Sequence, residues 1–376
     1  MRLTARQLNR ATLARQLLLG RAPLDAIEGI EKIVALQAQE PASPYLALWA
    51  RLIGFDGTSL DRAFAEHAIV KAQLMRVTLH AVSAADYPAF HEAMQPTLRA
   101  ARLNDRRFTS ENVPIEAVER LAPDLLAFAS EARRNADAEA WIEARLGAPK
   151  PRVWWALRQY GPFVHAPTDA PWSYGSRPSY MAAPEQERPG DAAASVQHLV
   201  RRYLEAFGPA SLQDIAQFGT IYRPPVQEAL AAMGDRLRRF DGPGNTVLYD
   251  VPDGAVPDED VRAPARLLPM WDSSLLGYAD RSRIVPADYR KLVMRNNGDV
   301  LPTVLVNGLV AGVWRTTAEG IEATAFHELA KDDWEELDAE AAGLRGFLAG
   351  REPMIYGRYA HWWDDLPRCE VRVLGR

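Results

Sequence analysis

The sequence is poor in cysteine and has no long hydrophobic run. Its only cysteine, Cys369, excludes an internal disulfide and cannot form a zinc site by itself. The seven histidines show no ligand spacing with Cys369 or with one another, so we expect neither a metal nor another cofactor. No stretch of 18 or more apolar residues occurs, and the first ten residues are amphipathic and charged, unlike a signal-peptide core. We therefore expect a soluble, unexported protein in a reducing cytoplasm, with no membrane partner.

Length and charge restrict the protein class further. A chain of 376 residues is expected to form two to four domains, each able to bury a core. The formal net charge of -5, taken over the whole chain, disfavours a nucleic-acid partner. The charge is uneven, however. Residues 1–110 hold 14 Lys and Arg against 10 Asp and Glu, whereas residues 319–370 hold 5 against 13. The first third is therefore free to face a polyanion, although solvated surface explains the same pattern.

The stretch 34–45 contains two glutamines, Gln37 and Gln39, at a predicted helix break. An apolar, helix-like run over 27–36 meets Pro41 and Pro44, and a residue before proline is pushed out of the α region, so the helix is expected to stop near Gln37 or Ala38. In extended chain, residues i and i+2 share a face, so both amides could point at one site. From spacing alone, capping of carbonyls at a helix end is the simpler interpretation of the two glutamines.

The rest of the first unit supports this stretch. Residues 45–52 resume helical spacing and are expected to bury Leu48 and Leu52. Residues 69–82 change to a β period, with Arg76, Thr78 and His80 on the polar face. Helices followed by a β pair are the order of a winged helix, and the polar face could meet a partner. For His80 alone, a structural or merely exposed role is the simpler interpretation.

Two further units follow. In the second, a helix ends at Gly147, residues 153–157 begin another with a buried aromatic pair, and residues 177–191 are the best linker candidate. In the third, a helix over 193–207 is followed by a capping box at Ser211, a helix over 224–233 and a hairpin over 237–249. This order predicts a winged helix.

Residues from 263 onward are β-rich and end in an acidic helix. Asn307-Gly308 within residues 303–314 predicts a tight type I′ hairpin. The expected fold class is thus α+β, with three tandem winged helices and a C-terminal β-barrel-like domain. The expected domains are 1–112 with the Gln-Ala-Gln motif, 113–190 with the linker, 191–262, and 263–376.

Three groups of residues together resemble a known family, the winged-helix DNA glycosylases of the AlkZ and YcaQ type. They are Gln37-Ala38-Gln39-Glu40-Pro41 with residues 45–52, Arg76-Val77-Thr78-Leu79-His80, and Asp272-Ser273-Ser274-Leu275-Leu276 with Arg281-Ser282-Arg283. The resemblance covers nearly the whole chain. It implies a C-shaped body that holds duplex DNA on its concave side, and Gln37 and Gln39 as the catalytic motif. The second glutamine places the chain with the AlkZ branch, because the YcaQ branch typically has aspartate there.

The chemistry of an amide pair is consistent with this resemblance. Glycosidic bond cleavage normally uses two carboxylates, whereas glutamine does not titrate and can only orient a water through its carbonyl and NH2 groups. The leaving group must then already be good, as a purine alkylated at N7 or N3 is, because it carries positive charge and departs neutral. Glu40 could assist as a base or by stabilising the oxocarbenium-like state, although a surface role at the helix end is simpler.

The expected function is therefore a monofunctional DNA glycosylase of base excision repair. It would act as a monomer near the nucleoid on alkylated purines in double-stranded DNA. The resemblance extends this substrate class to bulky and cross-linked N7-alkylguanine. The Asn307-Gly308 hairpin is the candidate probe of the duplex, ahead of the hairpin at Asn245; an ordinary turn is an equally simple interpretation. The candidate DNA-contacting residues are Arg51, Arg76, Thr78, His80, Arg281, Arg283, Asn307 and Gly308.

Two other functions remain open from the sequence. A non-catalytic winged-helix DNA-binding protein or transcriptional regulator would read the major groove with a basic helix, yet residues 224–233 offer mainly Gln227, Glu228 and alanines. A protein-binding scaffold is the third. The sequence leaves open which adduct is preferred, whether cross-links are unhooked, and whether the role is self-resistance to a genotoxin or general repair.

Overall fold

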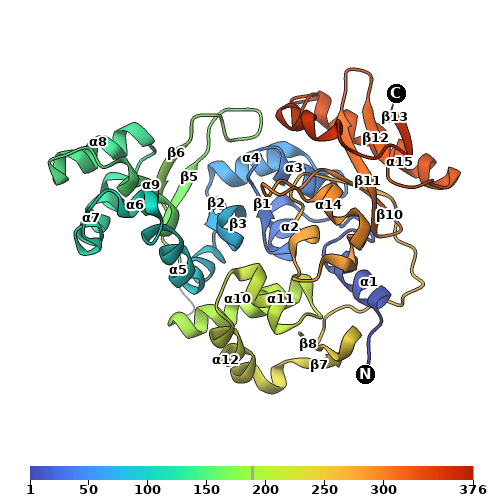
Figure 1. Ribbon diagram of the computed structural model, residues 1–376, viewed down its shortest axis with the longest axis horizontal. Coiled ribbons are helices and arrows are strands. Elements are labelled where there is room, and N and C mark those ends of the chain that lie inside the picture. Colours follow the sequence, from blue (N-terminus) through green and yellow to red (C-terminus); the bar gives the residue numbers. More distant parts are fainter. Residues whose placement is uncertain (188–189, 376) are drawn as a thin grey trace.

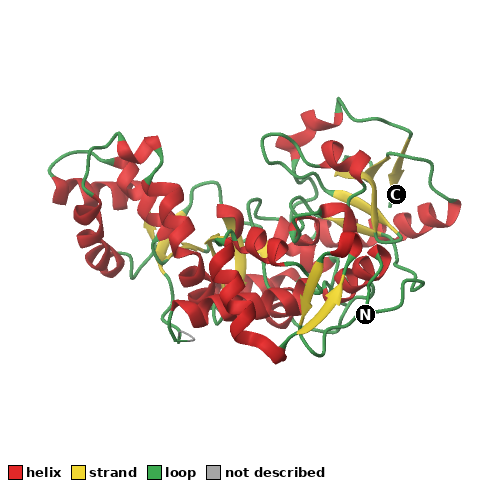
Figure 2. Cartoon of the chain, turned by 60° about the horizontal axis from the view of Figure 1, so that its bottom comes forward, coloured by secondary structure: helices red, strands yellow, loops and turns green. Residues whose placement is uncertain are grey.

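The computed structural model describes residues 1–187 and 190–375. The chain mixes helices with antiparallel sheets, and Figure 1 shows four successive groups of elements. In Figure 2 the helices around α7 and α8 lie at one end of the molecule and the C-terminal elements at the other. Within the described ranges, no helix is long and apolar enough to cross a membrane.

The first group surrounds a three-stranded sheet in the order β1-β3-β2. Its elements are α1 (Ala5–Arg15), α2 (Ala26–Ile33), β1 (Leu36–Gln37), α3 (Ser43–Trp49), α4 (Gly57–Ala65), β2 (Ile69–Leu74), a 3-10 turn (Met75–Val77), β3 (Thr78–Ser83), α5 (Tyr87–Leu103) and α6 (Arg106–Thr109). As expected, α3 buries Leu48, and Leu52 just after it is also buried. Helix α5 packs against both α9 and α10 and so joins this group to the next two.

The second group combines three helices with a sheet in the order β4-β6-β5. Its elements are α7 (Ile115–Phe128), β4 (Arg133–Arg134), α8 (Asn135–Leu146), α9 (Pro151–Tyr160), β5 (Phe163–Ala166) and β6 (Ser179–Ala182). Gly147 ends α8 with a φ of 74°, as predicted. The predicted linker 177–191 is wrong in part, because Ser179–Ala182 pairs with β5; residues 188–189 of that linker lie outside the described residues.

The third group has the predicted element order. It consists of α10 (Ala192–Phe207), α11 (Leu212–Gly219), α12 (Arg223–Met233), β7 (Arg238–Asp241) and β8 (Val247–Asp250). Ser211 and Asp214 form the predicted capping box at the start of α11. The two strands pair as an antiparallel hairpin.

The C-terminal group is an open antiparallel sheet in the order β13-β12-β11-β10-β9. Its elements are β9 (Arg266–Leu268), α13 (Ser273–Leu276), α14 (Arg290–Val293), β10 (Thr303–Val306), β11 (Leu309–Thr316), β12 (Ile321–Ala325), α15 (Lys331–Ala349), a 3-10 helix (Gly357–Trp363) and β13 (Glu370–Leu374). Among the described strands, β13 and β9 do not pair, so the expected barrel-like closure is wrong. Helix α15 instead packs against both edge strands.

Two large hydrophobic cores meet at the Gln-Ala-Gln segment. Val34 and Ala35 belong to the core shared with the second and third groups, whereas Leu36 and Ala38 belong to the core shared with the C-terminal group. The segment is therefore held on both sides by residues distant in the sequence.

Candidate active site at the Gln-Ala-Gln segment

The backbone around Gln37 is a strand, which corrects the predicted end of the preceding helix. Helix α2 ends at Ile33, and Val34 takes a φ of 75°. Leu36 and Gln37 then pair with Ala81 and His80 of β3, and the Ala38 amide donates to the Leu79 carbonyl at 2.8 Å. The predicted continuation of the helix to Gln37 or Ala38 is wrong because these backbone groups find partners on β3 instead. Gln37 is the last residue of β1, and Gln39 lies in the bend that follows it.

A second contact fixes the same segment from the C-terminal group. The Ser273 hydroxyl donates to the Ala35 carbonyl at 2.8 Å. The neighbouring Asp272 accepts two hydrogen bonds of 2.8 Å from the Arg51 guanidinium, and both charged side chains are fully buried. Together these bonds tie α13 to the chain on either side of the Gln-Ala-Gln segment.

Gln37 is held by Arg76, a half-buried residue whose guanidinium Nη1 is buried. The Arg76 Nη2 donates to the Gln37 Oε1 at 2.6 Å and lies 3.3 Å from the His80 Nε2. Gln37 is only 5% exposed. Arg76 adopts a left-handed φ of 55°, and its own backbone amide donates to the Thr220 hydroxyl at 2.7 Å, which links the site to the end of α11. The Gln37 amide is thus fixed in orientation.

The charges of this cluster follow from burial. Burial lowers the pKa of His80 well below its ordinary value, and the nearby Arg76 charge lowers it further. His80 is therefore neutral at pH 7, with Nδ1 donating to the Thr78 carbonyl at 3.1 Å and Nε2 free to accept from Arg76. Burial and then the Arg281 charge lower the pKa of Arg76 to about 10, so Arg76 remains a cation at pH 7.

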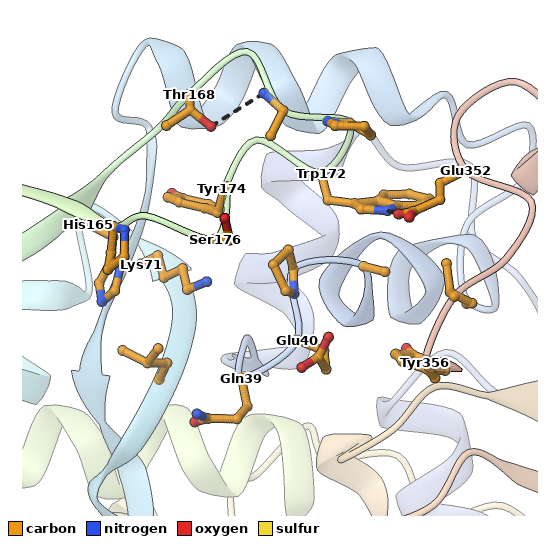
Figure 3. Close-up of a pocket in the computed structure, with 18 of the residues that line it drawn as sticks. Gln39, Glu40, Lys71, His165, Thr168, Trp172, Tyr174, Ser176, Glu352 and Tyr356 are labelled. Atoms are coloured by element: carbon orange, nitrogen blue, oxygen red, sulfur yellow. Dashed lines mark hydrogen bonds between the residues drawn. The ribbon is translucent and has the colours of Figure 1, made fainter. Parts of the chain in front are cut away.

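Gln39, in contrast, is exposed and lines a cleft of about 650 Å³. Figure 3 shows Gln39 and Glu40 on one side of this cleft and Tyr174 and Trp172 on the other, with Lys71 reaching in from β2. Gln37 is not among the lining residues. The structure thus separates the two amides into one that is anchored and one that is accessible.

Glu40 is engaged by the C-terminal group. The Tyr359 hydroxyl donates to the Glu40 Oε1 at 2.9 Å, and Arg358 forms an ion pair with the same carboxylate. Glu40 precedes α3 rather than ending a helix, so the predicted position at a helix end is wrong. Its carboxylate is occupied by two donors.

The structure divides the candidate DNA-contacting residues into three sets. Arg51 and His80 have no exposed surface, because Arg51 pairs with Asp272 and His80 lies between Arg76 and Thr78, so direct DNA contact by either is not supported. Arg76 and Thr78 are half-buried, and the Thr78 hydroxyl donates to the Met75 carbonyl at 3.0 Å. Arg281 and Arg283 are also half-buried, with the Arg283 guanidinium 4.1 Å from the centre of the Tyr278 ring.

The Asn307-Gly308 turn exists as predicted but is packed against α1. Asn307 and Gly308 have positive φ angles of 47° and 81°. The Asn307 Oδ1 accepts from the Arg10 Nη2 at 2.6 Å, and the Gly308 carbonyl accepts from the Asn9 Nδ2 at 2.8 Å. Because α1 packs against this turn, the structure does not support the prediction that the turn is a free probe of DNA.

Sequence reasoning missed the residues that complete the cleft beside Gln39. These residues come from β2 (Lys71), from β5 (His165) and from the chain after β5 (Trp172 and Tyr174), and no short motif joins them. The one available signal was Lys71 itself, a charged residue in an otherwise apolar strand pattern.

Comparison with known proteins places the chain in a family. The family model for "DNA glycosylase AlkZ-like" proteins matches residues 30–347. The chain belongs to the AlkZ-like DNA glycosylase family. It is thus an enzyme of the class that hydrolyses N-glycosyl bonds between base and sugar.

Comparisons of sequence and of structure both match this AlkZ-like chain to AlkZ of Streptomyces sahachiroi. An interstrand DNA cross-link repair glycosylase is 24% identical over 379 residues, covering 91% of this chain and 96% of the relative. The solved structure of the DNA glycosylase AlkZ aligns with a TM-score of 0.78 at 20% identity, covering 94% of this chain and 99% of that one. The structural likeness establishes a shared fold.

Proposed function

We propose that this glycosylase is monofunctional and hydrolyses the N-glycosidic bond of cationic alkylated purines in duplex DNA, leaving an abasic site. N7-alkylguanine and N3-alkyladenine are the expected lesions. The observation that carries the proposal is the pair of amides two residues apart, one anchored by Arg76 and one exposed in a cleft. An amide cannot act as a general base at neutral pH, so the substrate must bring a leaving group that needs no protonation.

The two amides would divide the task. The Gln37 side-chain oxygen already accepts one hydrogen bond from Arg76. We therefore assign the contact of Gln37 with the water to its NH2 group and to the second lone pair of that oxygen. We assign to Gln39 the direct contact with the attacking water, because its side chain is exposed at the cleft. Together they would hold one water beneath C1′ of the sugar, which is a positioning effect. Glu40 would keep its structural ion pair with Arg358.

A group of arginines near this site supports duplex DNA as the partner. Burial and then the Arg281 charge lower the pKa of Arg76, and burial and then the Arg290 charge lower the pKa of Arg281, so the three side chains lie close enough for their charges to act on one another. Cations gathered in this way are suited to a polyanion. We assign the phosphate contact to Arg281, and we interpret the successive helix–hairpin groups as winged helices of a C-shaped monomer.

The relative from Streptomyces sahachiroi is named for interstrand cross-link repair, and this supports bulky or cross-linked N7-alkylguanine as additional substrates. A non-catalytic regulator is disfavoured, because the family consists of glycosylases and because α12 has few side chains suited to reading bases.

The test is release of 7-methylguanine from methylated duplex DNA by the purified protein, measured by mass spectrometry of the free base. Wild type should release the base, whereas Gln37→Ala and Gln39→Ala should not, with binding to the same duplex retained. Gln213→Ala, which changes an exposed glutamine on α11, is the matched control and should behave as wild type. If wild type releases neither 7-methylguanine nor a bulkier N7 adduct, the proposed substrate class is wrong.

A further inference from the structure

The cleft beside Gln39 contains an amine that contacts an aromatic ring but has no hydrogen-bond acceptor among the described residues. Lys71 is 4% exposed, and no other residue in the described part of the chain forms a hydrogen bond or an ion pair with it. Its Nζ lies 4.4 Å from the centre of the Tyr174 ring and faces the cleft. A buried ammonium group is costly unless it is paired, so this position calls for an acceptor that the chain itself does not supply.

The walls of the cleft are aromatic and are held in place. The Trp172 Nε1 donates to the Glu352 carboxylate at 2.7 Å, and the Trp172 ring packs edge-on to Tyr45 at 5.2 Å. Tyr174 packs edge-on to Phe64 at 5.0 Å. Rigid aromatic side chains with one unsatisfied donor are the usual lining of a site for a planar organic group.

The other groups in the cleft argue against a backbone phosphate as the occupant. Glu40, which is paired with Arg358, and Glu352 line the same space, and the two carboxylates offset the positive charge of Arg358 and Lys71 that would otherwise favour a phosphate. Burial, followed by the charges of Lys71 and Arg158, keeps the pKa of His165 well below its ordinary value, so this ring adds no positive charge at pH 7. The volume of about 650 Å³ is in the range that holds a drug-sized group, larger than one base.

We propose that this cleft is a subsite for the substituent carried on the alkylated purine. The group that fits it is planar and aromatic and carries a hydrogen-bond acceptor for the Lys71 ammonium group. Because Gln39 lines the same cleft, a substituent bound there stays attached to a purine whose C1′ is within reach of the catalytic amide. This inference rests on the proposed function and specifies its substrate class.

The experiment compares three duplexes that each carry one N7-alkylated guanine. The substituent is methyl, benzyl, which is aromatic without an acceptor, or phenacyl, which is aromatic with a carbonyl acceptor. Single-turnover base release is measured with wild type and with Lys71→Met, in which a side chain of similar length lacks the charge. Lys32→Met, which changes an exposed lysine on α2, is the matched control.

Wild type should release the phenacyl adduct about 10-fold faster than the benzyl adduct, as one hydrogen bond to a charged donor allows. Lys71→Met should remove that difference and lower methyl release far less, while Lys32→Met should keep it. Trp172→Phe should slow both aromatic adducts relative to the methyl adduct. Thermal unfolding of each variant confirms that it is folded.

Two results would overturn the subsite. One is an equal phenacyl-to-benzyl ratio in wild type and Lys71→Met. The other is a loss in Lys71→Met that is equally large for all three substituents, because Lys71 would then act on the purine or on the fold. If wild type releases none of the three bases, the proposed function itself fails and the subsite with it. Release of 7-methylguanine alone would leave the proposed function standing and reject the subsite.

Discussion

Arg76 is the residue on which the geometry of the Gln-Ala-Gln segment depends. It donates to Gln37, lies beside the neutral His80, and is tied through its backbone to Thr220. Its Nη1 is buried and has no hydrogen-bond partner among the described residues. This arrangement makes Arg76 a positioning residue for Gln37, and its loss would leave the amide free to rotate.

We therefore predict that Arg76→Met lowers single-turnover base release by about 10- to 100-fold, the effect of losing one hydrogen bond to a charged group. The affinity for an abasic-site duplex should change much less than the rate. Arg99→Met, which changes an exposed arginine paired with Glu119, is the control. An Arg76→Met enzyme with wild-type single-turnover kinetics would refute the positioning role.

Lys71 gives a prediction for how the stability of the folded protein depends on pH. Burial lowers the pKa of Lys71 to about 8, an effect that the Glu40 charge partly opposes. Below pH 8 the folded protein carries a buried charge that costs about 3 kcal/mol relative to the unfolded chain. As the pH rises from 8 to 10.5, the folded state loses this proton before the unfolded state does, and the cost disappears.

Lys71→Met should thus unfold at higher urea concentration than wild type at pH 7, with a gap that narrows towards pH 10. Urea titrations at pH 7, 8.5 and 10 measure this gap directly. A gap that stays constant with pH would show that the Lys71 charge does not destabilise the folded protein. A residue that lowers the stability of the folded protein is expected where function requires that residue.

At the scale of elements, the sequence predicted those helices and strands whose ends are set by local signals. The third group was located by Ser211 with Asp214, by the prolines that open α12, and by the glycines between β7 and β8. These signals act over a few residues and need no partner elsewhere in the chain.

The sequence could not reveal features that depend on distant partners. Helix α2 ends early because β3 pairs with Leu36 and Gln37. Arg51 is buried because Asp272 lies opposite it, and the Asn307-Gly308 turn is occupied because α1 packs there. The resemblance pointed to Gln37 and Gln39 as candidate catalytic residues, whereas Lys71 and Trp172 required the fold.

The ion pair between Arg51, just after α3, and Asp272, at the start of α13, gives a prediction at this scale. Arg51→Met leaves the buried Asp272 carboxylate without its cation, which should reduce the free energy of unfolding by about 3–5 kcal/mol. Arg99→Met removes an exposed ion pair and should cost no more than about 1 kcal/mol. Chemical denaturation of both variants measures the difference. Similar values for the two would mean that the Arg51–Asp272 pair does not hold the elements together.

At the scale of the whole molecule, all four groups contribute to the candidate site. Gln39 and Lys71 come from the first, Trp172 and His165 from the second, Thr220 from the third through Arg76, and Ser273 and Arg358 from the last. The two hydrophobic cores meet at residues 34–38, so the candidate segment is packed on both sides. Such support suits a site that works by orienting one water.

DNA binding is the prediction that belongs to this scale. Because the net charge is negative, affinity should come from few phosphate contacts, and the contact proposed above is Arg281, whose charge acts on Arg76. Arg281→Ala should lower the slope of log affinity against log salt by about 1 for any duplex sequence. Arg372→Ala, on the last strand, should leave the slope unchanged. An unchanged slope in Arg281→Ala would remove this residue from the DNA interface.

The central claim is that two amides position the water that displaces a cationic purine. Single-turnover release of 7-methylguanine by wild type, Gln37→Ala, Gln39→Ala and the double variant tests it most directly. Because the two amides act on one water, the double variant should be little slower than Gln39→Ala alone, with duplex affinity retained throughout. Full activity in Gln39→Ala, or single losses that simply multiply in the double variant, would contradict the account.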